Sequence, residues 1–289
     1  MNRFVREIRT TAGLSQEEFA QRLGVSFATI NRWENSRAVP NNLAQNTLYD
    51  FCREENIPAG DLILKKIENE VASLDIPEGR TVFFHGSKSG IKGEIRPVSR
   101  EHCDFGAGFY MGTDPMQPLT LICGYEESRF YVVSVDMDGL ERLDIPSDIE
   151  WAMIVAYNRG RMDEIRGTRF YEKYRALMEG KDIITGSIAD DRMFFVLDRF
   201  FRGDITDVSL VDSLSALELG RQYVAVTARG CDAVRIEKEI PFSHLERRLL
   251  QNISGAGRQS GVDRAEEICR SHRREGRYFD EILDSPRKE

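Results

Sequence analysis

The sequence lacks a paired set of cysteines and any cluster of metal-ligating residues. It has five cysteines, an odd number, and no CxxC motif. This usage is typical of reduced thiols in the cytosol rather than of a disulfide framework. The four histidines are scattered, so the clustered ligands of a tetrahedral zinc site are missing. We therefore expect a cytoplasmic protein that holds no metal.

Long apolar runs and an excess of positive charge are also missing. No stretch reaches the roughly 18 apolar residues of a membrane helix, and the N-terminal residues show no signal-peptide pattern. The formal net charge is -8. An acidic chain argues against coating nucleic acid along its whole surface, but it is compatible with a small DNA-binding domain that has a local basic face.

The chain does have enough apolar material for packed cores. Hydrophobic residues make up 41% and charged residues 30% of its 289 residues, as in soluble globular proteins. This length favours two or three compact units, and a polar stretch with Pro77 and Gly79 marks a boundary. The expected units are a helical domain at 1–66, a linker at 67–80, an α+β domain at 81–242 and a helical segment at 243–289.

The first part of the chain has the pattern of short capped helices. Ser15 and Glu18 form a capping box, and Gly24 ends the same helix at a left-handed position. Ser26 caps the next helix, and a fourth helix is expected to bury Leu43, Leu48 and Phe51. A helix that ends in glycine, a short turn and a serine-capped helix together form a helix-turn-helix layout.

The stretch LSQEEFAQRLGVSFATINRWENS resembles the repressor-like helix-turn-helix family, and the resemblance covers residues 1–64. It implies that the third helix enters the major groove of DNA, with Arg32 as the candidate for a bidentate contact to guanine. The residues expected at phosphates or base edges are Gln16, Ser26, Phe27, Ala28, Thr29, Arg32 and Asn35. Such domains gain affinity from two half-sites, so we expect a homodimer or a partner protein. A helical domain that binds protein is the alternative.

The second part mixes strand and helix patterns without regular alternation, which favours an α+β fold. Strand-like runs occur at 81–87, 129–137, 181–189, 221–230 and 232–240. The stretch DFGAGFY at 104–110 lacks the third glycine of a dinucleotide fingerprint, since Met111 stands there, and it precedes an aromatic strand instead of a helix. A phosphate-binding loop is therefore disfavoured.

Two stretches, FFHGS at 83–87 and DFGAGFY at 104–110, together resemble the histidine–tyrosine half of the diphtheria-toxin-like and poly-ADP-ribose-polymerase-like ADP-ribosyltransferases. The likeness extends over residues 81–240 to a poorly characterised bacterial subgroup of that superfamily. It implies that NAD is the substrate and that no metal takes part. His85 would bond a ribose hydroxyl, the Gly86 backbone would pair with the nicotinamide amide, and Tyr110 would stack on the nicotinamide ring. The residues expected to hold NAD are His85, Gly86, Ser87, Gly108, Phe109, Tyr110 and Asp191.

The superfamily's third element is a glutamate at the start of a late strand, and Gln222 stands at the matching position. An amide can bond a ribose hydroxyl but carries no charge to stabilise an oxocarbenium-like ribose. Three interpretations stay open: an unusual acceptor, replacement by Asp190, Asp191 or Glu218, or binding without catalysis. Asp190 and Asp191 are equally typical of helix caps. The expected catalytic residues are His85, Tyr110 and Gln222.

These signals predict a mono-ADP-ribosyltransferase that carries its own DNA-binding domain and modifies an unidentified macromolecule. By resemblance, such a protein belongs to a toxin–antitoxin or defence module. The alternative is a transcriptional regulator whose degenerate second domain senses NAD or ADP-ribose without catalysis.

A polar, charged segment follows the second domain. Gly255, Gly257 and Gly261 interrupt its helical pattern, so we expect a flexible loop followed by two or three short helices. Phe279 and Ile282 indicate docking on a surface. A lid, an oligomer contact and a partner-binding tail all fit this pattern.

Overall fold

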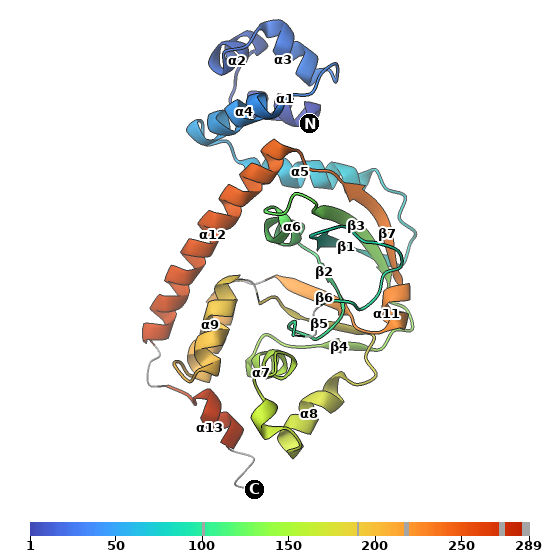
Figure 1. Cartoon of the computed structure of the whole chain (residues 1–289), viewed down its shortest axis with the longest axis vertical. Helices are drawn as coiled ribbons and strands as arrows, with labels where there is room; N and C mark the ends of the chain where they lie inside the picture. Colours follow the sequence, from blue (N-terminus) through green and yellow to red (C-terminus); the bar gives the residue numbers. More distant parts are fainter. Residues whose placement is uncertain (100–101, 190, 217–219, 272–274, 285–289) are drawn as a thin grey trace.

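The computed structural model describes residues 1–99, 102–189, 191–216, 220–271 and 275–284. A helical N-terminal part lies at one end, and a mixed α/β part built on one sheet forms the rest (Figure 1). The long helix α12, His244–Ser271, runs beside both parts. The N-terminus lies in the helical part and the C-terminus at the opposite end of the molecule.

Five helices form the N-terminal part, and the capping signals indicated those that begin after Ser15 and Ser26. They are α1 Asn2–Thr11, α2 Gln16–Leu23, α3 Phe27–Glu34, α4 Asn42–Glu54 and α5 Ala59–Ala72. The Ser15 capping box is present, and Gly24 ends α2 with φ 66°. Leu48 and Phe51 of α4 are buried as expected, but the expectation for Leu43 was wrong, since it lies outside the inward face and is 75% exposed.

One seven-stranded sheet organises the second part, in the order β4-β5-β6-β2-β1-β3-β7. The strands are β1 Arg80–Ser87, β2 Phe109–Gly112, β3 Arg129–Asp136, β4 Arg142–Asp144, β5 Ile183–Ser187, β6 Arg221–Ala225 and β7 Val234–Ile240. Among the strand pairs in the described residues, only β4–β5 is parallel. The predicted strand at 221–230 ends early, because the Thr227 side chain caps the short helix α11, Ala228–Asp232.

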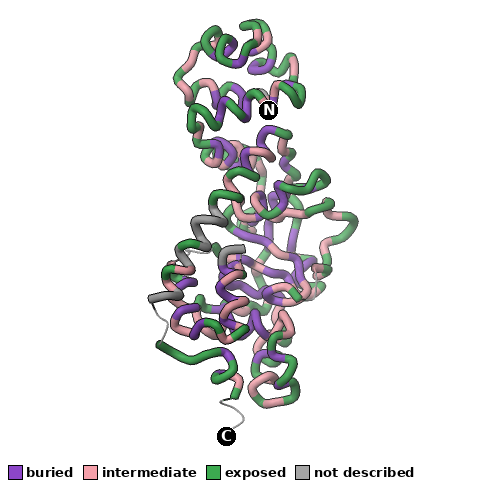
Figure 2. The backbone as a smooth tube through the Cα atoms, turned by 60° about the vertical axis from the view of Figure 1, so that its left-hand side comes forward, coloured by how far each residue is buried: buried purple, intermediate pink, exposed green. Residues whose placement is uncertain are grey.

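The remaining helices cover the sheet. They are α6 Met116–Ile122, α7 Ile149–Asn158, the 3-10 turn η1 Asp163–Ile165, α8 Arg169–Met178, α9 Asp191–Phe201, α10 Asp207–Ala216 and α13 Phe279–Asp284. Trp151 of α7, Phe200 of α9 and Phe279 of α13 share one buried cluster with Val224 of the sheet. Buried residues concentrate along the sheet and on the inner faces of these helices (Figure 2).

Helix α12 corrects the expectation of a flexible glycine loop, because it continues from His244 through the three glycines to Ser271. A glycine inside a helix costs roughly 1 kcal/mol relative to alanine, and packing of the helix offsets that cost. Leu245, Leu249 and Leu250 belong to the same buried cluster as the core of the N-terminal helices. Further along, α12 contacts α9 and α10. The N-terminal and α/β parts therefore share one apolar core.

Candidate functional site

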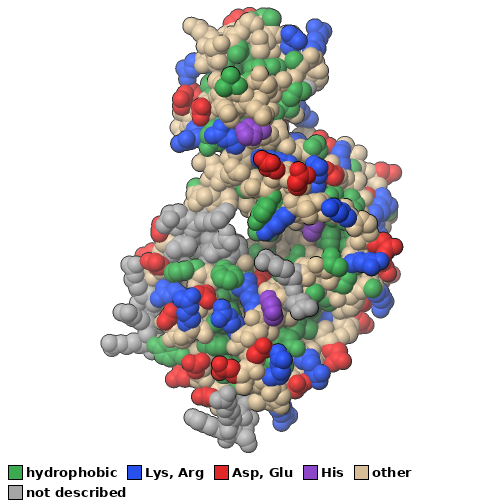
Figure 3. All heavy atoms as spheres, viewed as in Figure 1, with side chains coloured by type: hydrophobic (Ala, Val, Ile, Leu, Met, Phe, Trp, Pro, Cys, Tyr) green, Lys and Arg blue, Asp and Glu red, His purple; other side chains and the backbone are tan. Residues whose placement is uncertain are grey.

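The sheet is nearly divided in two between β1 and β2. Strands β1 and β3 are joined by eight residue pairs, whereas β1 and β2 are joined by one pair, Phe84 with Gly112. Beyond that pair the two strands separate. A cleft of about 1640 Å³ opens there, lined by Phe84, His85 and Gly86 of β1, Tyr110 of β2 and Gln222 of β6. Its mouth is visible as a hollow in the face drawn in Figure 3.

His85 closes the gap between the separating strands with its side chain. Its Nδ1 lies 2.7 Å from the backbone oxygen of Tyr110, and its ring stacks on Phe109 with centroids 4.2 Å apart. Because a carbonyl can only accept, Nδ1 carries the hydrogen. Burial lowers the pKa of His85 below its ordinary value of 6.5, against the smaller opposite effect of the Tyr110 contact. The ring is therefore neutral, and Nε2 remains as an acceptor.

Tyr110 is fixed by the loop that precedes it. Its hydroxyl donates to the Gly106 carbonyl at 2.8 Å and accepts from the Phe105 N–H at 3.1 Å. Burial raises the pKa of Tyr110 far above its ordinary range, so the phenol stays protonated. The hydroxyl is committed to the loop, which leaves the ring as the part available to a ligand in the cleft.

The glycines around Tyr110 serve close packing and chain reversal. Gly106 has φ 75°, a conformation that favours glycine. A Cβ at Gly108 would lie 2.4 Å from Val224, and one at Gly86 would lie 2.9 Å from the Pro118 oxygen of α6. Side chains at these two positions would push β2 from β6 and β1 from α6, so the glycines let the cleft walls approach each other.

The other residues predicted to hold NAD lie differently. Among the described residues, Ser87, Gly108 and Phe109 are not part of the cleft lining. Ser87 ends β1 opposite Arg129, Gly108 packs against Val224, and Phe109 stacks on His85. Asp191 begins α9, and its side chain lies outside the described residues, as do Asp190 and Glu218 altogether. The structure thus brings together His85, Gly86, Tyr110 and Gln222 around one cleft.

Gln222 is 6% exposed and lies at the base of the cleft. Its Nε2 donates to Asp104 Oδ2 and to the Ser187 carbonyl, both at 3.0 Å. Asp104 also receives Arg159 Nη2 at 2.5 Å and the Ala189 N–H at 3.2 Å. No local pattern in the sequence indicates this contact, because Asp104 lies 118 positions before Gln222.

Basic and aromatic side chains, not predicted from the sequence, complete the cleft lining. Lys88, Arg159 and Arg161 line it, and the two arginines are paired with Asp104 and Asp198. Lys88 lies over the Tyr125 ring at 4.4 Å, and Arg159 over the Phe194 ring at 4.5 Å. Cations and flat rings suit a ligand that combines phosphates with heteroaromatic rings.

The predicted DNA contacts lie on and beside α3. Phe27, Ala28 and Arg32 are exposed. Ser26 is occupied as the cap of α3, since its hydroxyl accepts from the Thr29 N–H at 3.2 Å and lies 2.9 Å from the Thr29 hydroxyl. The exposed surface of α3 therefore consists mainly of Phe27, Ala28 and Arg32.

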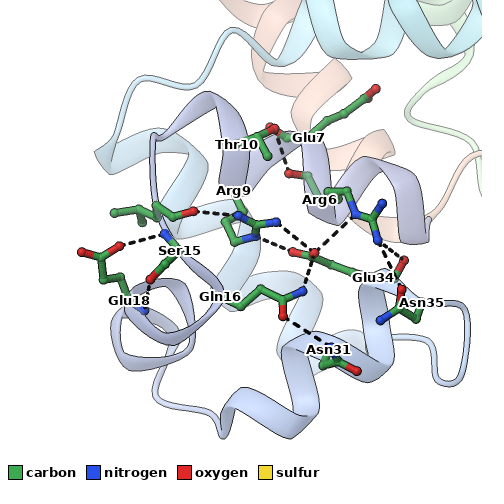
Figure 4. A network of polar contacts seen from close by, with 11 residues as sticks. Arg6, Glu7, Arg9, Thr10, Ser15, Gln16, Glu18, Asn31, Glu34 and Asn35 are labelled. Carbon is green, nitrogen blue, oxygen red and sulfur yellow. Dashed lines mark hydrogen bonds and ion pairs between the residues drawn. The ribbon is translucent and has the colours of Figure 1, made fainter.

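Gln16 and Asn35, predicted to contact phosphates, both take part in a network around a buried acid, Glu34 (Figure 4). Gln16 Nε2 donates to Glu34 Oε2 at 2.7 Å, and Arg9 Nε donates to Oε1 at 2.6 Å. Burial raises the pKa of Glu34, but the bonds from Arg9 and Gln16 outweigh it and hold the pKa below 4.5. The ionised carboxylate thus fastens α3 to α1 and α2.

In the described part of the chain, no group of three or more His, Cys, Asp or Glu side chains could hold a metal ion. No helix within the described ranges is long and apolar enough to cross a membrane.

The fold and the exposed α3 define a helix-turn-helix protein with a mixed α/β domain. Residues 5–44 match the family described as "Helix-turn-helix", which supports DNA binding. Residues 81–236, more than half of the chain, match the family described as "Protein of unknown function (DUF3990)", and the chain belongs to that family. Neither the curated proteins nor the solved structures gave a match.

Proposed function

We propose that this protein is an NAD-dependent mono-ADP-ribosyltransferase attached to its own DNA-binding domain. The observation that carries the proposal is the convergence of His85, Gly86, Tyr110 and Gln222 on one cleft where β1 and β2 separate. These four residues match the positions that the resemblance to ADP-ribosyltransferases assigns to NAD.

The chemistry of each group suits NAD. The neutral His85 ring accepts a ribose hydroxyl at Nε2, since its Nδ1 is occupied by the Tyr110 carbonyl. The Tyr110 ring stacks on nicotinamide, and the Gly86 backbone pairs with the nicotinamide amide. The cleft volume of about 1640 Å³ exceeds the size of typical small-ligand pockets and accommodates a dinucleotide. Lys88, which lines the cleft, supplies charge complementary to the diphosphate.

In the proposed reaction the bond between the ribose C1′ and the nicotinamide nitrogen breaks, and nicotinamide leaves with the bonding electron pair. A nucleophile of the acceptor macromolecule then bonds to C1′ and releases its proton to solvent. Preorganised polar groups such as Gln222 stabilise the positive charge that develops on the ribose. In the family context, the product would act within a toxin–antitoxin or defence module.

The test measures nicotinamide release from NAD in the presence of cell lysate. Wild-type protein should release nicotinamide, and both His85→Ala and Tyr110→Ala should lose this activity. Tyr278→Ala, which alters an exposed tyrosine distant in sequence from the cleft residues, serves as the control. Saturable NAD binding without turnover in any lysate would exclude the enzyme.

The second candidate is a DNA-binding regulator that senses NAD or ADP-ribose. The observation that favours it is an ion pair: Asp104, the acid in contact with Gln222, is already paired with Arg159. An ion-paired carboxylate offers less stabilisation to a cation than a free one. If NAD raises the melting temperature, as a ligand specific for the folded state must, and is never turned over, this candidate replaces the first.

A further inference from the structure

We infer that Asp104 is a positioning residue, which holds the Gln222 amide so that its oxygen Oε1 is presented to the cleft as a hydrogen-bond acceptor. This inference rests on the proposed function for the identity of the ligand. It deepens that function by naming Asp104 as the residue that orients Gln222, which stands at the position of the missing glutamate. The pair Asp104–Gln222 then performs the hydroxyl-binding part of that role without placing a charge on the ligand.

The surroundings of Asp104 fix its carboxylate firmly. The residue is 7% exposed, and its two oxygens receive three donors. Arg159 binds Oδ1, while the Gln222 amide and the Ala189 N–H both bind Oδ2. The Asp104 backbone carbonyl also accepts from Asn158 Nδ2 at 3.0 Å. Donors from α7, from β6 and from the chain after β5 therefore converge on one buried acid.

The orientation of the Gln222 amide follows from the chemistry of its neighbours. The Asp104 carboxylate and the Ser187 carbonyl can only accept hydrogen bonds, so the nitrogen must face both. A flipped amide would set its oxygen against two other oxygens and lose both bonds. With both N–H groups committed, Oε1 is the polar atom left for the cleft that Gln222 lines.

The charge of Asp104 also makes the Gln222 oxygen Oε1 a stronger hydrogen-bond acceptor. An N–H group that donates to a carboxylate polarises its amide and increases the electron density on the amide oxygen. Arg159 neutralises Asp104 overall, so the effect reaches the ligand through the amide only. The ligand group that fits Oε1 is a hydroxyl donor, and in NAD this is a hydroxyl of the nicotinamide ribose.

The experiment compares NAD with an analogue that lacks the 2′-hydroxyl of the nicotinamide ribose. In wild-type protein the analogue should bind about tenfold more weakly, as expected for one buried hydrogen bond. In Asp104→Asn this ratio should fall to near one, because the Gln222 amide is no longer held. Asp198→Asn is the matched control, since Asp198 also lines the cleft and pairs with an arginine, Arg161. A tenfold ratio that persists in Asp104→Asn overturns the inference.

A second variant keeps the inference testable if Asp104→Asn does not fold. Gln222→Glu would place a carboxylate at the 3.0 Å contact with Asp104, and two such groups share one proton. NAD affinity of this variant should fall as the pH rises from about 5 to about 8, beyond any change in wild type. The same pH dependence in variant and wild type overturns the inference.

A nuclear magnetic resonance measurement separates this inference from the proposed function. The side-chain amide signals of Gln222, identified by their loss in Gln222→Met, should shift in Asp104→Asn and stay unchanged in Asp198→Asn, with no NAD present. Unshifted signals overturn the Asp104–Gln222 pairing directly. If the signals shift but wild-type protein binds no NAD, the proposed function fails and the assigned ligand fails with it.

Discussion

The imidazole of His85 and the backbone carbonyl of Tyr110 are joined by a 2.7 Å hydrogen bond across the opening between β1 and β2. A side chain here takes the place of the backbone ladder that the two strands form only at Phe84 and Gly112. The His85 ring therefore lines the cleft and also forms one of the hydrogen bonds that set the width of the cleft. Changes at His85 should alter both ligand binding and the stability of the sheet.

The first prediction concerns the pH dependence of stability. Burial lowers the pKa of His85 in the folded protein, whereas the unfolded chain takes up the proton near the ordinary value of 6.5. Unfolding is therefore accompanied by proton uptake as the pH falls through 6.5, and the folded state loses stability. The melting temperature should decrease between about pH 7.5 and about pH 5.5, and less steeply in His85→Gln. His102→Gln, a change at an exposed histidine, should leave the wild-type slope intact; equal slopes in all three proteins would contradict the prediction.

The second prediction separates the hydroxyl of Tyr110 from its ring. Tyr110→Phe removes the bonds to Gly106 and Phe105 and should cost about 1–2 kcal/mol of unfolding free energy. Because the ring remains, NAD affinity by calorimetry should change only a few-fold, while Tyr110→Ala should abolish it. If Tyr110→Phe folds normally yet binds no NAD, the hydroxyl itself contacts the ligand.

The third prediction concerns Glu34. Glu34→Gln removes the charge that Arg9 and Arg6 face, and should lower the stability of the N-terminal helices by about 2 kcal/mol. Trp33 fluorescence, measured in a Trp151→Phe background, reports unfolding of this part. Glu17→Gln on the surface of α2 is the control, and equal denaturation midpoints for the two variants would argue against a structural role for the network.

The fourth prediction concerns DNA. Arg32→Ala should weaken binding to the protein's own promoter by about 1–3 kcal/mol, because the guanidinium is expected to contact a base. Arg22→Ala is the control, since Arg22 lies on α2 and pairs with Glu55. Fluorescence anisotropy at fixed salt measures both. Unchanged affinity in Arg32→Ala would show that α3 does not use this residue in the groove.

Local signals made the N-terminal helices predictable. The Ser15 capping box and the left-handed Gly24 depend on neighbours within a few residues, so they can be recognised from the sequence alone. The glycines of α12 show the opposite case. Their intrinsic preference favoured a loop, but the packing of Leu245 and Leu249 against the N-terminal core decides the helix.

The candidate site was predictable only in part. His85 and Tyr110 could be predicted because each lies in a short stretch with a recognisable pattern, HGS and GAGFY. The partner of Gln222 could not be found in that way, since its bond to Asp104 joins β6 to a loop 118 residues earlier. The short strand β4 and the helix α8 were also missed, although Thr168 caps α8 as a local signal would require.

The bond between the Leu245 N–H and Gln45 Oε1 spans 200 positions of the chain. During synthesis the N-terminal helices leave the ribosome 200 positions before the segment that joins them to the α/β part. Contacts of such long range form slowly, since the closure of the intervening chain comes first. Until α12 arrives, the apolar side chains it covers stay exposed to water and to other nascent chains. The N-terminal helices and the α/β part therefore dock against each other late in folding.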